Sequence, residues 1–285
     1  MGDIRLFVCC HRKENVPEHP LMRPIQVGAA LSDRRFDGFQ QDDEGENISL
    51  KNRSYCELTA QYWAWKNVKA DYCGFFHYRR YLYPDTTAKR PYIIRTKPTD
   101  ALLERLGYGS FAELIRQYDL IAPIGEDMRV SVREHYQTAP HHRGKDLALA
   151  EEIVARRHPE MKAAMESYLS GTVHYFGNMY IMRREMFADY CAWLFPILEE
   201  FDRHADLTGY SPQELRVDGY LAERLFGIYY THMKRALSVL ELPRVHFHTG
   251  RDYLSKQLTN VLLPPGSARR AAIKWLRQRG KKEGF

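Results

Sequence analysis

The stretch DYCGFFHYRRYL, residues 71–82, is the part of the chain that decides the fold. Its first half, residues 71–77, is apolar enough to form a buried strand, and polar side chains follow at once. The preceding segment ISLKNRSYCELTAQYWAWKN, residues 48–67, carries apolar residues at helical spacing. A helix, a short loop and a buried strand with a charged end are typical of an α/β fold.

The helix before this strand is predicted to begin at Ser54. Ser54 and Glu57 have the spacing of a capping box, in which each side chain bonds to the backbone N–H of the other. Residues 67–70 should end the helix.

The same patterns extend along most of the chain. Further strands are predicted at 4–10, 25–31, 118–123 and 173–182, and further helices at 102–106, from 110, and at 145–157, 160–169, 185–201 and 212–230. Pro212 suits the first position of the last helix. Residues 125–143 look irregular and are the best candidate for a mobile loop. We therefore expect one α/β domain over residues 1–250, with a mixed, mostly parallel central sheet flanked by helices, and a C-terminal extension over 251–285.

The charge of the chain is concentrated at its end. The net charge is +6, and residues 268–285 hold seven basic residues and one acidic residue, so the remainder is neutral. A neutral core argues against nucleic-acid binding. Ile273, Trp275 and Leu276 lie among these basic residues and predict contact with an anionic membrane surface; a disordered, solubilising tail is the alternative.

Cysteine usage and hydropathy predict a cytoplasmic location. The five cysteines show no CxxC spacing, which favours a reducing compartment. The N-terminus has no apolar signal segment, and no apolar stretch is long enough to span a bilayer. With the basic tail, we expect a protein on the inner face of the cytoplasmic membrane.

The strongest candidate site is the polar cluster at 77–80. His77, Arg79 and Arg80 follow a buried strand, and strand ends of this kind deliver side chains to the ligand edge of a sheet. Two adjacent guanidinium groups bind phosphate oxygens well. A structural corner of ion pairs is the alternative.

Other polar residues are candidates for the rest of a ligand. His11, Arg12 and Lys13 follow the first strand, where nucleotide-binding α/β folds meet their ligand. Asn178, beside a glycine in a predicted strand, could bind a sugar hydroxyl, or the glycine could mark a β-bulge. The candidates for a sugar or an acceptor also include Tyr78, His142 and Asp146.

Two acidic segments are candidates for catalysis and for metal binding. Asp218, near the start of the last helix, could act as a general base, or belong to an ion-paired helix face. Asp42, Asp43 and Glu44 could hold a divalent cation, with an ordinary acidic loop as the favoured alternative. No zinc spacing, GxGxxG, GxxxxGK[ST] or GxSxG motif is present.

The segments 48–67 and 71–82 resemble a bacterial family of exopolysaccharide and capsular-polysaccharide glycosyltransferases, long described as a domain of unknown function. The resemblance continues at NMYIMRREMFADYCAWLFPIL (178–198) and GYLAERL (219–225), and covers most of residues 4–235. It implies a GT-A-like nucleotide-sugar-binding fold.

The resemblance also implies roles for residues. GT-A enzymes usually carry an Asp-x-Asp motif where this chain has residues 77–80, so Arg79 and Arg80 would neutralise the diphosphate without a metal, and Mg or Mn stays an alternative. The segment VDGYLAER is similar to the Glu-Asp motif of inverting enzymes, with Asp218 as the base and Glu223 as the second choice.

The function implied is transfer of a sugar, galactose or galactofuranose, from a nucleotide-sugar donor, most simply UDP-linked. The acceptor would be a lipid-linked or oligosaccharide intermediate of capsule, exopolysaccharide or O-antigen. The alternative is a non-catalytic nucleotide- or carbohydrate-binding component of a polysaccharide assembly complex.

Overall fold

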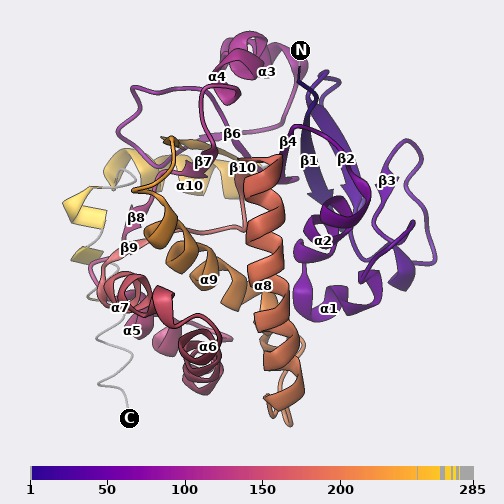
Figure 1. The fold of residues 1–285 in the computed structure, drawn as a ribbon. Helices are drawn as coiled ribbons and strands as arrows, with labels where there is room; N and C mark the ends of the chain where they lie inside the picture. Colours follow the sequence, from indigo (N-terminus) through magenta and orange to yellow (C-terminus); the bar gives the residue numbers. More distant parts are fainter. Residues whose placement is uncertain (1, 249, 264–266, 271, 274–275, 277–285) are drawn as a thin grey trace.

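The computed structural model describes residues 2–248, 250–263, 267–270, 272–273 and 276, and Figure 1 shows a central sheet flanked by helices. The strand order is β11-β7-β10-β4-β1-β2-β3. Its strands are β1 (Ile4–Cys10), β2 (Met22–Gln26), β3 (Gln40–Gln41), β4 (Tyr72–His77), β7 (Leu120–Pro123), β10 (Tyr180–Arg183) and β11 (Val239–Leu242). Only β10 runs antiparallel to its neighbours on this path, so the sheet is mixed and mostly parallel, as predicted.

Three short strands branch from the end of β4. They are β5 (Arg80–Leu82), β6 (Tyr92–Arg95) and β12 (Arg244–Phe247). β5 pairs with β4 and with β12, and β12 pairs with β6. Two further strands, β8 (Glu126–Asp127) and β9 (Val173–His174), form a separate ribbon.

Helices lie on both faces of the sheet, and some of them pack on other helices instead (Figure 1). They are α1 (Asn52–Tyr55), α2 (Leu58–Asn67), α3 (Asp100–Arg105), α4 (Phe111–Ile115), α5 (Val132–Thr138), α6 (Gly144–Arg157), α7 (Lys162–Ser170), α8 (Arg184–His204), α9 (Val217–Met233) and α10 (Gly250–Leu262). Among the described residues, no helix combines the length and the apolar character needed to cross a membrane. Trp275, part of the predicted membrane contact, lies outside the described residues.

Apolar side chains of the central strands pack on both faces, which is why these strands are continuous apolar runs in the sequence. Phe7 of β1 and Phe75 of β4 point into one core, with α2, α8 and α9. Leu6 and Phe76 point into the other core. Gly74 lies where β4 passes between its neighbours, and a Cβ there would be 2.6 Å from a Leu6 methyl carbon.

Two sequence predictions about helix starts were wrong. Ser54 lies inside α1, and α2 begins at Leu58 without a side-chain cap. The break between the helices falls at Cys56, whose φ of 52° is left-handed. Pro212 precedes α9, which begins only at Val217.

Three loop and strand predictions were also wrong. Residues 125–143 contain β8 and α5, and the hydroxyl of Ser131 caps α5 by accepting from the Glu134 N–H. The apolar run 173–182 is two strands in different sheets, separated by a left-handed turn at Gly177, with φ 98°. The run 25–31 ends as a strand at Gln26 and continues as the 3-10 helix η1 (Ala29–Leu31).

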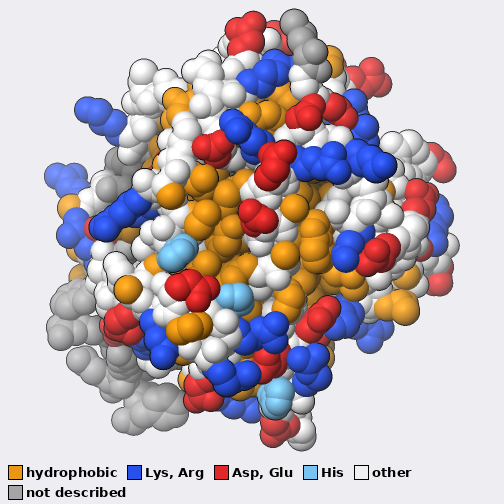
Figure 2. Space-filling view, viewed as in Figure 1, with side chains coloured by type: hydrophobic (Ala, Val, Ile, Leu, Met, Phe, Trp, Pro, Cys, Tyr) orange, Lys and Arg blue, Asp and Glu red, His pale blue; other side chains and the backbone are white. Residues whose placement is uncertain are grey.

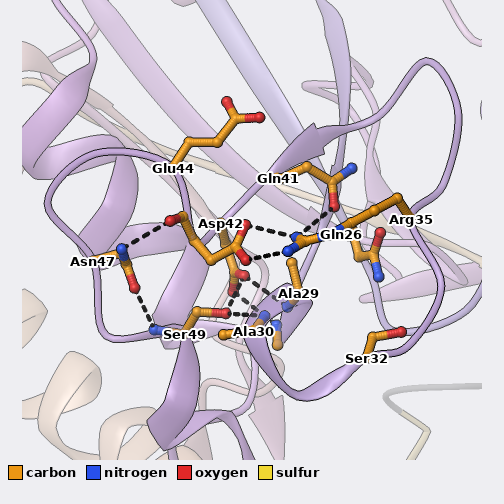
Figure 3. Close-up of polar contacts among 12 residues, drawn as sticks. Gln26, Ala29, Ala30, Ser32, Arg35, Gln41, Asp42, Glu44, Asn47 and Ser49 are labelled. Carbon is orange, nitrogen blue, oxygen red and sulfur yellow. Dashed lines mark hydrogen bonds and ion pairs between the residues drawn. The ribbon is translucent and has the colours of Figure 1, made fainter.

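A buried carboxylate holds the acidic loop after β3 in place. Asp42 accepts hydrogen bonds from the N–H of Ala29 at 2.9 Å and the hydroxyl of Ser49 at 2.5 Å (Figure 3). It also accepts from the N–H of Gly28 at 2.8 Å and the hydroxyl of Thr59 at 2.6 Å. Its oxygens are thus occupied by four donors. Asp42 thereby joins the end of β2 to the segment that leads into α2.

We predict that Asp42→Ala lowers the free energy of unfolding by about 3 kcal/mol, because it leaves buried donors without an acceptor. Urea denaturation measures this. Asp43→Ala is the matched control: Asp43 pairs with the exposed Arg35, at 2.6 Å, and its loss should cost far less. Equal effects of the two substitutions would contradict the assignment.

Candidate functional site

The polar residues after β1 and β4 lie side by side. The two strands are parallel, with Cys9 opposite His77, so their carboxyl ends meet at one edge of the sheet. The buried ring of Tyr78 is the centre of the contact. The His11 ring lies 5.1 Å from it, and the guanidinium carbons of Arg12 and Arg79 each lie 5.2 Å from its centroid.

Three hollows surround this contact. A cleft of about 590 Å³ is lined by His11, Val27, Asn52, Arg53, Cys56, Glu57, Pro212, Leu215 and Arg216. A second hollow, of about 660 Å³, has Arg12, Tyr78 and Arg79 on one side and residues 96–98 with His248 on the other. A third, of about 600 Å³, lies between residues 11–13 and residues 31–36. The loop after β1 therefore borders all three.

Arg79 and Arg80 bring positive charge that no ion pair matches among the described residues, although the charges of Glu223 and Glu57 oppose the effect of burial on the pKa of Arg80. No ion pair found in the described part of the chain involves either residue. Burial, followed by repulsion from Arg244, lowers the pKa of Arg80. Arg80 is partly withdrawn from water and Arg79 is exposed beside it, so two adjacent guanidinium groups are available to bind an anion.

The two histidines of the site are neutral at physiological pH. Burial and the charges of Arg80 and Arg79 lower the pKa of His77 to about 2. Burial, followed by Arg12, lowers the pKa of His11. Each neutral imidazole can donate one hydrogen bond to a ligand without adding charge.

Glu57 is a carboxylate of the cleft that the sequence analysis did not select. It lines the 590 Å³ cleft, and its Oε1 lies 3.9 Å from Nε2 of His77. Burial raises its pKa. Glu57 lies in the segment 48–67, which carries the most specific part of the family resemblance, and this could have identified it. Its spacing from Ser54 instead predicted a capping role, which it does not have.

Asp218 is fully buried and does not line the cleft. Its Oδ2 accepts a short hydrogen bond from the Ser54 hydroxyl, and its Oδ1 has no hydrogen-bond partner. Burial, followed by the charge of Asp202, raises its pKa to about 7. Asp202 itself accepts from Tyr55 and Lys51, both at 2.8 Å. Contact with an acceptor hydroxyl is therefore closed to Asp218 in this conformation.

Glu223 and Asn178 hold the backbone beside Arg80. Glu223 accepts from the N–H of Gly177 at 2.6 Å and pairs with Arg224 at 2.7 Å. The buried Asn178 donates to the carbonyl of Gly219 at 3.0 Å, so its side chain ties this turn to α9. A Cβ at Gly177 would lie 3.8 Å from a nitrogen of Arg80, so the turn and the guanidinium group are in close contact.

The remaining candidates lie at the margins or outside the site. His142 stacks on Tyr220, with ring centroids 4.2 Å apart, and burial lowers its pKa to about 4. Tyr220 also lies under Arg216, a residue of the cleft, so His142 belongs to the rim. Asp146 is buried and accepts from a tyrosine hydroxyl.

Lys13 is exposed and lies 3.5 Å from a carboxylate oxygen of Asp37, while Arg12 pairs with Glu14 at 2.6 Å. Among the described residues, no group of three or more His, Cys, Asp or Glu side chains is arranged to hold a metal ion.

Comparisons with known proteins agree with this architecture. The family model described as "Domain of unknown function (DUF4422)" matches residues 5–235. An apo structure of WbbM, a bifunctional glycosyltransferase, is 30% identical, with a TM-score of 0.82 over 87% of this chain and 46% of that one. The chain thus spans about half the length of WbbM. No curated protein matches.

The buried Asp218 predicts a pH-dependent stability. Its folded pKa of about 7 exceeds the ordinary value of 3.8, so the folded protein holds this proton more tightly than the unfolded chain does. Stability from this group should therefore fall as the pH rises from about 4 to about 7. Asp218→Asn should be more stable relative to wild type at pH 8 than at pH 5, as measured by thermal melting.

The control for this experiment is Asp37→Asn, at an exposed position, whose effect should be small at both pH values. The same stability difference between Asp218→Asn and wild type at pH 5 and pH 8 would show that the carboxyl does not titrate in this range.

Proposed function

This chain belongs to the DUF4422 family, and we propose that it is a glycosyltransferase that moves a sugar from a nucleotide-sugar donor to a polysaccharide intermediate. The observation that carries the proposal is the unpaired Arg79–Arg80 cluster at the carboxyl edge of β1 and β4. The likeness of 87% of this chain to a bifunctional glycosyltransferase supports it, and both arginines lie within residues 5–235, which the family model matches.

In our proposal, the donor lies across the mouth of the 590 Å³ cleft. The nucleoside would occupy the part lined by His11, Val27 and Asn52, with the diphosphate toward Arg79 and Arg80. We propose a UDP-linked donor, with galactose or galactofuranose as the first sugars to test.

In this proposal, positive charge stabilises the diphosphate leaving group. As the bond between the anomeric carbon and the diphosphate breaks, negative charge grows on the departing oxygen, and fixed guanidinium groups stabilise it. Neutral His77 can add a hydrogen bond. We propose that these groups replace a divalent cation. In support, Asp42 already accepts four hydrogen bonds, and Asp43 pairs with Arg35.

We assign the role of general base to Glu57. The acceptor hydroxyl forms the new bond to the anomeric carbon, and Glu57 takes its proton. A raised pKa suits this role, because a base works best when its pKa approaches the working pH. Asp218 and Glu223 then act as positioning residues: Asp218 bonds to Ser54 in α1, and Glu223 fixes the turn beside Arg80.

We further propose that the acceptor is a lipid-linked or oligosaccharide intermediate of a surface polysaccharide, used at the inner face of the cytoplasmic membrane. His142 and Tyr220, stacked at the rim near Arg216, are the residues that we propose for contact with the acceptor sugar. Figure 2 shows basic and acidic side chains interspersed on the viewed face, which argues against a nucleic-acid surface there.

We predict that UDP raises the melting temperature of the wild type in the presence of EDTA, and that Arg79→Ala/Arg80→Ala loses this shift. Arg203→Ala, at an exposed arginine of α8, is the control and should keep it. If EDTA abolishes the rise in melting temperature, a metal ion binds the diphosphate. If no nucleotide raises the melting temperature, the proposed donor site is wrong.

We predict that Glu57→Gln lowers the rate of sugar transfer by about 10²-fold or more while preserving the UDP-induced melting shift. Asp218→Asn is the comparison, and it should retain more activity than Glu57→Gln. The rates come from a radiolabelled transfer assay with the active nucleotide sugar. If Asp218→Asn is inactive and Glu57→Gln is not, the base is Asp218. Binding without turnover in the wild type would favour a non-catalytic binding protein.

A further inference from the structure

The helix α10 carries a stripe of exposed apolar side chains. Leu254, Leu258, Val261 and Leu262 are 68%, 62%, 73% and 62% exposed. Their spacing places them within an arc of about 100° on one side of the helix. Lys256 and Ser255 are exposed outside this arc. The helix is therefore amphipathic, with its apolar side uncovered.

This concentration differs from the rest of the described surface. The other exposed large apolar residues there, Leu31, Leu50, Val173 and Leu276, lie far apart along the chain and do not share a helix. Single exposed leucines are ordinary, whereas a contiguous apolar stripe marks a surface that binds something.

The charge of the chain indicates what α10 binds. Residues 268–285 carry the whole net charge of +6. The start of this segment lies close to the helix, because Arg270 donates to the carbonyl of Leu263 at 3.2 Å, and its guanidinium group lies 5.5 Å from the Tyr92 ring centroid in β6. The apolar stripe and the basic segment thus begin in the same part of the molecule.

We propose that α10 is a membrane-surface helix that lies in the head-group region of an anionic bilayer, with the Leu254–Leu258–Val261–Leu262 stripe buried among the acyl chains. A helix with an apolar side, followed by basic residues, gains from both apolar burial and attraction to anionic lipid. The tail supplies the charge and α10 the apolar contact.

The position of α10 connects this surface with the proposed reaction. The helix begins at Gly250, shortly after β12 ends at Phe247, and Phe247 and His248 line the 660 Å³ hollow together with Arg79 and Lys97. Binding through α10 would bring this hollow close to lipid head groups, where a lipid-linked acceptor is found. The membrane contact itself does not depend on catalysis, so it can be tested separately from the proposed function.

The test is co-sedimentation of the full chain with vesicles of phosphatidylcholine alone or mixed with phosphatidylglycerol. The wild type should bind the mixed vesicles, and the binding should weaken as salt is raised. Leu254→Ser/Leu258→Ser should lower the partition coefficient at least about tenfold. Leu31→Ser/Leu50→Ser is the matched control, since these exposed leucines lie elsewhere, and it should bind as the wild type does.

The α10 variant is shown to be folded if UDP raises its melting temperature as much as that of the wild type. If UDP does not bind the wild type, an unchanged melting temperature of the variant is the evidence for folding. The proposal would be overturned if the α10 variant bound the mixed vesicles as strongly as the wild type does. It would also be overturned if the wild type did not bind anionic vesicles. Analytical ultracentrifugation tests a different occupant of the stripe. If the wild type binds no vesicles but self-associates, and the α10 variant does not self-associate, the stripe binds a second copy of the chain.

Discussion

The parallel pairing of β1 with β4 is the constraint on which the site depends. Both strands are buried on both faces, so their register is held by two cores at once. With Cys9 opposite His77, the loops that follow the two strands must leave the sheet together. The contact of His11, Arg12 and Arg79 with the Tyr78 ring is a consequence of that register.

The site holds positively charged guanidinium groups close together, which does not stabilise the fold. Arg80 is partly withdrawn from water beside Arg244, and the arginines depress the pKa of His77. A purely structural cluster would be expected to include its own counter-ion, because burying an unpaired charge is costly. The most direct explanation is that an anionic ligand supplies the missing charge. The carboxylates nearby, Glu57 and Glu223, act on Arg80 through charge, but neither forms an ion pair with it among the described residues.

The sequence was sufficient for β1, β4 and β7 and for placing Arg79 and Arg80 directly after a buried strand, since continuous apolar runs and the residues that follow them are local features. It was insufficient where a side chain has a partner distant in the chain. Ser54 matched a capping box but bonds to Asp218, and Asp42 resembled a cation ligand but binds backbone groups near β2. The run 173–182 looked like one strand because its composition does not show that Gly177 turns the chain between two sheets.

A structure of the chain bound to UDP in the presence of EDTA tests the central claim most directly. The account predicts diphosphate oxygens within hydrogen-bonding distance of the guanidinium groups of Arg79 and Arg80, with the nucleoside in the cleft beside His11. A diphosphate bound away from both arginines, or a nucleoside outside the cleft, would contradict it.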